Sequence, residues 1–272
     1  FCKNPALALP LIALQHQDIV LKIDIRSLNG CVLCNGDGSD ASATMEELKI
    51  FGDYIYLDVD ERRKFAESSH EYLIEQLQYQ TASITANKTN DITLTFNHPC
   101  KELIWVFQHT TSNAEPSTTT SYSPTDYSST THTQGNDWFN YNGTADSTIA
   151  IPNAAPDLQA GGSSLSSDPF TTATITFNGR NRFTPRPPMY FKHLQPLYHY
   201  DNVPAKNVYA YSFALKPTEH QPSGTCNFSR LDNANLELAV SAGQTNLTIS
   251  MFARNYNVLR ISSGVSGLAY SV

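Results

Sequence analysis

The chain has 272 residues, 40% of them hydrophobic, which is enough to bury a substantial core in one or two domains. Its formal net charge of -7 argues against a surface that binds nucleic acid, because phosphate recognition needs clustered Lys and Arg side chains. No run of about 18 apolar residues occurs, so no transmembrane helix is expected. The 5 cysteines follow no regular framework, which indicates reduced thiols rather than a disulfide-stapled secreted domain.

The N-terminal part predicts strands followed by one short helix. Apolar and mostly polar residues alternate from residue 19 to residue 25, as a half-buried strand requires. A second strand is expected over residues 53–57. Asp58 is a candidate N-cap for a helix at about 59–67, with Glu61 as its capping-box partner.

From residue 72 onward, short alternating segments separated by turn residues predict a sandwich or jelly roll of antiparallel strands. A further strand is expected from residue 209 to residue 215, half-buried and stopped by Pro217, followed by a type I turn at 221–224. A second short helix is expected at about 189–197. The other segments with this alternation are residues 72–77, 92–96, 173–177, 236–240 and 247–251.

A long stretch at about 109–169 is rich in Ser and Thr and poor in aliphatic residues, so it predicts exposed loops rather than core elements. Asn142 begins an N-glycosylation pattern in this stretch. Nearby aromatic residues, among them Trp138 and Tyr141, are candidates for stacking on sugars. These three residues are the candidate positions for glycosylation or glycan contact.

Motifs for catalysis or metal binding are weak. Cys31 and Cys34 have zinc-knuckle spacing, but no second pair of ligands follows. The histidines form no HxH pair, and no GxSxG elbow or phosphate-binding glycine loop is present. We therefore expect no enzymatic activity, no cofactor and no metal.

Several segments in matching order carry a family resemblance. The most specific is YSFALKPTEHQPSGTCNFSRLDN at residues 211–233. Through these segments the chain resembles the major capsid proteins of large nucleocytoplasmic double-stranded DNA viruses, such as phycodnaviruses, iridoviruses and mimiviruses. The other segments are residues 4–14 with 19–25, 53–76, 96–103, 255–260 and 267–270.

The resemblance implies a viral double jelly roll with its first jelly roll only partly present. Residues 1–66 would be the C-terminal strands of the first, 67–71 a linker, and 72–272 the second. Because the family's proteins are longer, we expect the chain to be a C-terminal portion and to be poorly soluble when expressed alone.

The resemblance also implies a function and partners. Three copies would form a pseudo-hexagonal capsomer, and capsomers would tile an icosahedral shell with minor capsid and penton proteins. An internal membrane would lie beneath without direct insertion, and assembly would take place in the host cytoplasm. Within the segment at 180–200, the candidate contacts between subunits are Arg180, Arg182, Arg186 and Tyr190.

Two alternatives from other classes remain open. The first is a carbohydrate-binding β-sandwich or host-attachment module, for which the aromatic residues of the long loops would supply the contacts. The second is a jelly-roll enzyme, which requires a bound metal or a pair of carboxylates in a cleft.

Overall fold

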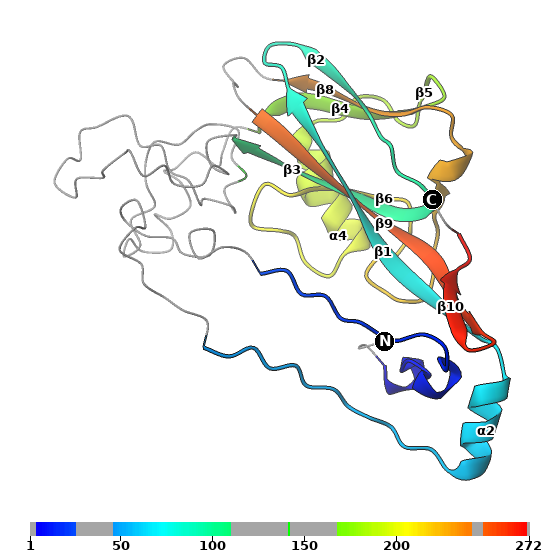
Figure 1. The fold of residues 1–272 in the computed structure, drawn as a ribbon. Helices are drawn as coiled ribbons and strands as arrows, with labels where there is room; N and C mark the ends of the chain where they lie inside the picture. Colours follow the sequence, from blue (N-terminus) through cyan, green and yellow to red (C-terminus); the bar gives the residue numbers. More distant parts are fainter. Residues whose placement is uncertain (1–3, 26–45, 110–140, 142–167, 241–246, 271–272) are drawn as a thin grey trace. The chain divides into compact units, whose positions relative to one another are not determined.

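A computed structural model describes residues 4–25, 46–109, 141, 168–240 and 247–270 (Figure 1). Most of its regular structure lies in two antiparallel sheets. The first sheet has the order β1 (His70–Ile84), β9 (Leu247–Ser262), β3 (Pro99–His109) and β6 (Tyr209–Ser212). In the second, the order is β2 (Thr89–Thr93), β8 (Ala234–Val240), β4 (Phe170–Phe177) and β5 (Arg180–Asn181).

Two short strands extend the first sheet. β7 (Cys226–Asn227) pairs with β3, and β10 (Val265–Leu268) pairs with β9. Strands that follow one another in the chain repeatedly lie in different sheets: β1, β3, β6 and β9 belong to the first, and β2, β4, β5 and β8 to the second. This alternation between facing sheets is the jelly-roll arrangement, so the predicted all-β fold class is confirmed.

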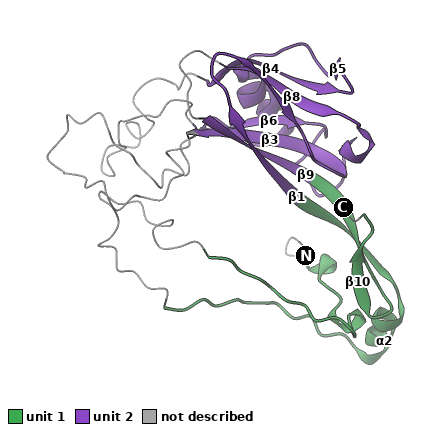
Figure 2. Ribbon diagram, turned by 45° about the horizontal axis from the view of Figure 1, so that its top comes forward, with its two compact units in different colours: residues 1–25, 44–76, 255–272 green, residues 26–43, 77–254 purple. Residues whose placement is uncertain are grey.

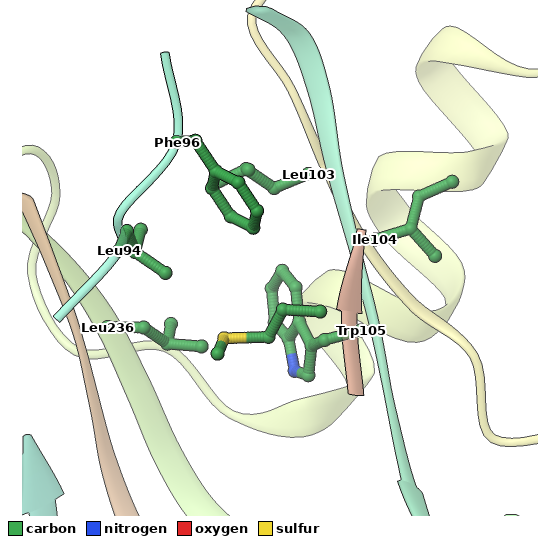
Figure 3. Close-up of a pocket in the computed structure, with 7 residues that line it drawn as sticks. Leu94, Phe96, Leu103, Ile104, Trp105 and Leu236 are labelled. Atoms are coloured by element: carbon green, nitrogen blue, oxygen red, sulfur yellow. The ribbon is translucent and has the colours of Figure 1, made fainter. Parts of the chain in front are cut away.

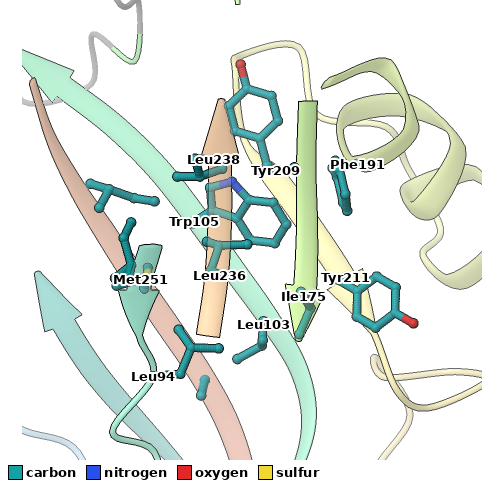
Figure 4. Close-up of a cluster of buried hydrophobic side chains, with 14 of the residues drawn as sticks. Leu94, Leu103, Trp105, Ile175, Phe191, Tyr209, Tyr211, Leu236, Leu238 and Met251 are labelled. Atoms are coloured by element: carbon teal, nitrogen blue, oxygen red, sulfur yellow. The ribbon is translucent and has the colours of Figure 1, made fainter. Parts of the chain in front are cut away.

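The core lies between the two sheets (Figure 4). In β8, buried and half-buried residues alternate along the whole strand, so that Leu236 and Leu238 face inward. From the first sheet, Trp105 packs against Tyr209 with ring centroids 6.2 Å apart and against Phe191 at 5.1 Å. Such aromatic pairs each contribute about 0.5–1.5 kcal/mol beyond the area they bury.

The prediction of a half-buried strand at 209–215 was wrong about both the length of the strand and its burial. The strand β6 ends at Ser212, and all four of its residues are buried. Its second face is covered by the π-helix η3 (Tyr190–Leu194) and by α4 (Gln195–His199). Gln195 Oε1 accepts a hydrogen bond of 3.1 Å from the Ser212 N–H. The helix expected at 189–197 is therefore present, and it explains the burial.

The helix expected at 59–67 forms with the predicted Asp58 cap, while the capping-box contact from Glu61 stays a prediction. The helix α2 spans Val59–Glu67, and Asp58 Oδ1 accepts a hydrogen bond of 2.7 Å from the Val59 N–H. The cap thus satisfies the first free amide of the helix. The remaining short helices are η1 (Pro5–Leu7), η2 (Leu11–Ala13) and η4 (Phe228–Arg230). None of the helices in the described ranges is long and apolar enough to span a membrane.

The strands expected at 19–25 and 53–57 do not form in the described part of the chain. A strand needs a neighbour to accept and donate its backbone hydrogen bonds, and neither segment is paired. Large apolar side chains stay exposed on both, including Val20 at 72% and Tyr56 at 92%. The alternating pattern was present in the sequence, but neither segment has a pairing partner among the described residues.

The described residues form two compact units (Figure 2). One contains residues 4–25, 46–76 and 255–270, and the other contains 77–109, 141, 168–240 and 247–254. Within the first unit, Asn257 Nδ2 donates to Gln76 Oε1 at 3.0 Å, and Tyr72 donates to the Ala8 carbonyl at 3.1 Å. The division predicted from the sequence, at residues 66 and 72, stays a prediction.

Candidate functional site

A close view of the sandwich interior shows a space far too small for a ligand (Figure 3). The cavity has a volume of about 10 Å³. A single water molecule needs roughly this much room, and small-molecule sites are typically about 300–1,000 Å³. The wall is formed by apolar residues of both sheets and of the chain after β2, and the Ile104 side chain points away from the cavity (Figure 3). The lining residues are Leu94, Phe96, Leu103, Ile104, Trp105, Leu236 and Met251.

The described residues contain no cluster of three or more His, Cys, Asp and Glu side chains that would hold a metal ion. The Nδ1 atom of His199 lies 3.0 Å from the Leu215 carbonyl oxygen, which is a structural contact within the chain. Cys31 and Cys34 lie outside the described residues.

A buried carboxylate in β3 is the most distinctive polar group of the sandwich. The side chain of Glu102 is fully buried, and Arg254 Nη1 in β9 lies 2.8 Å from its Oε1. The Tyr200 hydroxyl donates a hydrogen bond to Oε2. Burial, together with the negative charge of Glu102, raises the pKa of Tyr200 far above its ordinary value. Glu102 is thus held between a cation and a hydroxyl donor, an arrangement that suits a structural link between neighbouring parts of the fold.

A second polar group fixes the entry to β4. The Tyr209 hydroxyl donates a hydrogen bond of 2.6 Å to Asp168 Oδ1. The buried Lys192 places Nζ 3.8 Å from the same oxygen. Burial, and then the bond to Asp168, raise the pKa of Tyr209. The first residue described after the long Ser- and Thr-rich stretch is therefore tied to the aromatic core.

The four residues predicted to contact neighbouring subunits lie in one unit, but they have different surroundings. Arg180, in β5, is exposed. Arg182 hydrogen-bonds the Tyr211 side chain. The guanidinium of Arg186 lies 5.6 Å from the centroid of the Tyr190 ring, a cation–π distance. The structure therefore brings Arg186 and Tyr190 together, while Arg182 points to a partner within its own chain.

The candidate glycan contacts fall almost entirely outside the described residues. Trp138 and Asn142 are not described. Tyr141 is half-buried, and burial raises its pKa. The glycan hypothesis consequently stays a prediction.

An exposed apolar surface surrounds α4. We call it the α4 patch and define it as Leu194, Leu197, Tyr198 and Leu215. Leu197 is 69% exposed and Leu215 is 71% exposed. Residues 194, 197 and 198 share one face of the helical turn because they are three and four positions apart. Contiguous apolar surface of this kind is typical of protein–protein contacts.

Comparison with known proteins decides the family. A family model described as "Large eukaryotic DNA virus major capsid protein" matches residues 61–267, and one described as "Major capsid protein N-terminus" matches residues 1–58. The chain belongs to the major capsid proteins of large eukaryotic DNA viruses. This confirms the resemblance seen in the sequence motifs.

Relatives and structures of the family agree with this assignment. The major capsid protein of Phaeocystis pouchetii virus is 37% identical across 100% of this chain and 64% of its own length. That of Paramecium bursaria Chlorella virus 1 is also 37% identical, with the same shares. A chain of the PBCV-1 virus capsid superimposes with a TM-score of 0.66 at 33% identity, covering 99% of this chain and 68% of its own. The chain thus spans less than two thirds of these curated relatives.

The sequence did not reveal the buried network of this capsid-family chain. Glu102 was one of several carboxylates without an evident partner, and neither Arg254 nor Tyr200 carried a motif. The available signal was the position of Glu102 inside the family-like segment 96–103, directly before the apolar run at residues 103–107. A charged residue in such a strand is rarely buried unless it is paired.

Proposed function

We propose that this chain is a structural subunit of an icosahedral virus shell and has no enzymatic activity. The observation that carries the proposal is a jelly roll whose described core is closely packed, in a chain of the capsid family. The cavity inside the sandwich has room for about one water molecule, the described residues hold no metal cluster, and the buried carboxylate is paired. A rigid sandwich with apolar surface suits assembly through broad contacts.

The assembly we propose follows the family. Three copies form a pseudo-hexagonal capsomer, and each contributes two upright jelly rolls to the six columns of the trimer. Capsomers contact one another and minor capsid and penton proteins in the shell of the virion, above an internal membrane that the chain does not enter. Assembly takes place in the cytoplasm of the infected cell.

Within this assembly, we assign the α4 patch and the neighbouring Arg186–Tyr190 pair to contacts between copies of the chain. The patch is exposed and apolar, as the centre of a subunit interface tends to be. The Arg186 guanidinium stacked on Tyr190 adds a residue pair of the kind that is enriched at interface hot spots.

The direct test is the native mass of the subunits released from particles under mild conditions. We expect a species of three chains, which dissociates under denaturing conditions. A subunit that stays a single chain at all accessible concentrations, and in particles shows no three-fold capsomers, would overturn the proposal.

Variants of the chain test the interface. Leu197→Asp should weaken association at least tenfold, because it places a charge on an apolar contact. The matched control is Leu77→Asp in β1, where the side chain has a similar exposure of 63%. If both variants associate as the unchanged chain does, the α4 patch is not the interface.

We also propose that residues 1–66 are the C-terminal part of a first jelly roll. Support comes from the exposed apolar side chains of this region, such as Phe51 at 89% and Tyr56 at 92%, which isolated surface segments seldom carry in such number. The 272-residue chain expressed alone should be poorly soluble, and the double variant Phe51→Ser, Tyr56→Ser should increase its soluble fraction. A soluble fraction that the double variant leaves unchanged would contradict this division.

A further inference from the structure

Two cysteines lie directly opposite each other on neighbouring strands. Cys100 in β3 and Cys226 in β7 are register partners of an antiparallel pair. Side chains of directly opposite residues project from the same face of a sheet. Cys100 is fully buried in the core cluster, and Cys226 packs against that cluster. Both are free thiols in this structure.

The spacing of such partners suits a covalent link. Directly opposite residues of an antiparallel pair have Cα atoms about 4.5–5.5 Å apart. Disulfides join cysteines whose Cα atoms are about 4.4–6.8 Å apart. The bond therefore requires a change of side-chain torsions and at most a small shift of β7, which is only a two-residue strand.

The neighbourhood of Cys226 favours reaction at this thiol. Cys226 is partly exposed, whereas Cys100 is not. Burial raises the pKa of Cys226, and the Arg182 guanidinium offsets part of that rise. Because Cys226 is the partly exposed member of the pair, it is the thiol that an oxidant in solution can reach first.

We propose that Cys100 and Cys226 are a modification site, at which a small-molecule disulfide oxidises the two thiols to a cross-strand disulfide. The inference goes beyond the proposed shell function and does not depend on it. With glutathione disulfide, the Cys226 thiolate attacks one sulfur and releases one glutathione thiolate. The Cys100 thiolate then attacks the Cys226 sulfur and releases the second. The two protein thiols lose two protons and two electrons, and one glutathione disulfide becomes two glutathione molecules.

The bond would fasten a surface loop. Both β6 and β7 pair with β3, at residues 102–105 and 99–100 respectively, so residues 213–225 form a loop that leaves β3 and returns to it. This loop carries Leu215 of the α4 patch. The disulfide would link the end of this loop that returns to the sheet, at Cys226, covalently to β3. A reducing cell would keep the loop end unlinked, and the link would form when the protein meets an oxidising medium.

Peptide mapping of the full chain tests the inference. The folded chain is incubated with glutathione disulfide at pH 8, quenched with an alkylating agent and digested with trypsin. We expect residues 89–101 and 207–230 to appear as one linked peptide, lighter by two hydrogens than the sum, and at least fivefold more abundant than either peptide carrying glutathione. Burial raises the pKa of Cys100 to about 12, so only a small fraction of this thiol is ionised near neutral pH. Because the thiolate is the attacking species, formation of the disulfide should accelerate as the pH rises from 7 to 8.

Variants and a stability measurement complete the test. Cys226→Ser should abolish the linked peptide, and the control Cys31→Ser should retain it. Oxidation should raise the Tm of the unchanged chain by about 5 °C or more, reversibly with a thiol reductant. The inference is overturned if the folded, oxidised chain keeps both thiols open to alkylation, or if either cysteine links mainly to another cysteine. Should a variant fail to fold, the peptide map of the unchanged chain still decides.

Discussion

Glu102 Oε1 in β3 and Arg254 Nη1 in β9 lie 2.8 Å apart, and they join two neighbouring strands of one sheet. The carboxylate is fully buried, and the arginine side chain is 29% exposed. A buried charge is tolerated in a folded protein only when it is paired. The intact Glu102–Arg254 pair therefore adds little net stability, but the loss of one partner destabilises the fold strongly.

Removal of the arginine should therefore be costly. We expect Arg254→Met to lower the free energy of unfolding by about 3 kcal/mol, because it leaves the Glu102 carboxylate buried with only the Tyr200 hydroxyl as its described donor. Urea denaturation followed by tryptophan fluorescence measures the change.

The control is a pair of the same residue types at the surface. Arg260 Nη2 lies 2.7 Å from Glu71 Oε1, and both side chains are more than half exposed. Arg260→Met should change stability by less than about 1 kcal/mol. Equal losses in the two variants would show that burial does not determine the value of the Glu102–Arg254 pair.

Stability should fall at alkaline pH. Burial raises the pKa of Cys100 from 9.0 to about 12, and it also raises the pKa values of Tyr200 and Tyr209 above 10.0. The Cys100 thiol is mainly neutral in both states below pH 9, and the two tyrosines below pH 10. Above these values the unfolded chain ionises first, so the folded state loses up to about 1.4 kcal/mol per pH unit for each group.

The measurement is the Tm of the reduced chain between pH 8 and pH 11. Cys100→Ala removes the thiol, so its Tm should decline less steeply than that of the unchanged chain from pH 9 to pH 10. A Tm that stays constant up to pH 11 would contradict the raised pKa values.

Gly224 occupies a position that a side chain does not fit. Its φ is +140°, and a Cβ atom would lie 2.8 Å from the Phe213 carbonyl oxygen. We expect Gly224→Ala to destabilise the chain by about 2–4 kcal/mol, because it combines a strained backbone with a clash against main-chain atoms. The midpoint of urea unfolding reports the loss.

Gly179→Ala is the matched control. Gly179 also has a positive φ, of +74°, but a Cβ atom there would meet no atom within 4 Å. The cost should be about 1 kcal/mol, from backbone strain alone. If both variants lose the same free energy of unfolding, the close approach of the Phe213 backbone does not contribute to the cost of a side chain at Gly224.

Glycan binding, predicted from the loop aromatics, can be tested on an array of host-type glycans. Trp138→Ala should remove binding by losing the stacking surface, while Tyr79→Ala, an exposed aromatic in β1, should leave it unchanged. The absence of any bound glycan, or binding that survives Trp138→Ala, would eliminate the hypothesis.

The segment at 221–224, where a type I turn was predicted, illustrates how far sequence patterns reach. Pro222 and Gly224 predicted a turn from their positional preferences alone. The glycine is in fact required by the approach of the Phe213 backbone, a contact between residues eleven positions apart. The structure shows only a bend at residue 221 and no turn at 222–224, so the predicted type I turn does not form, and packing against Phe213 is what requires the glycine.

Local chemistry in the sequence determined the elements that depend on near neighbours: the helix α2 with its Asp58 cap, the alternating strand β8, and the family motifs at 211–233. Only the tertiary structure decided the burial of both faces of β6 under α4, the pairing of Glu102 with Arg254, and the opposition of Cys100 and Cys226. Each of these joins residues distant in the chain, and strand order and register, which no short pattern encodes, determine which of them meet. The strands expected at 19–25 and 53–57 failed for the same reason, since alternation makes a strand possible and a neighbouring strand makes it form.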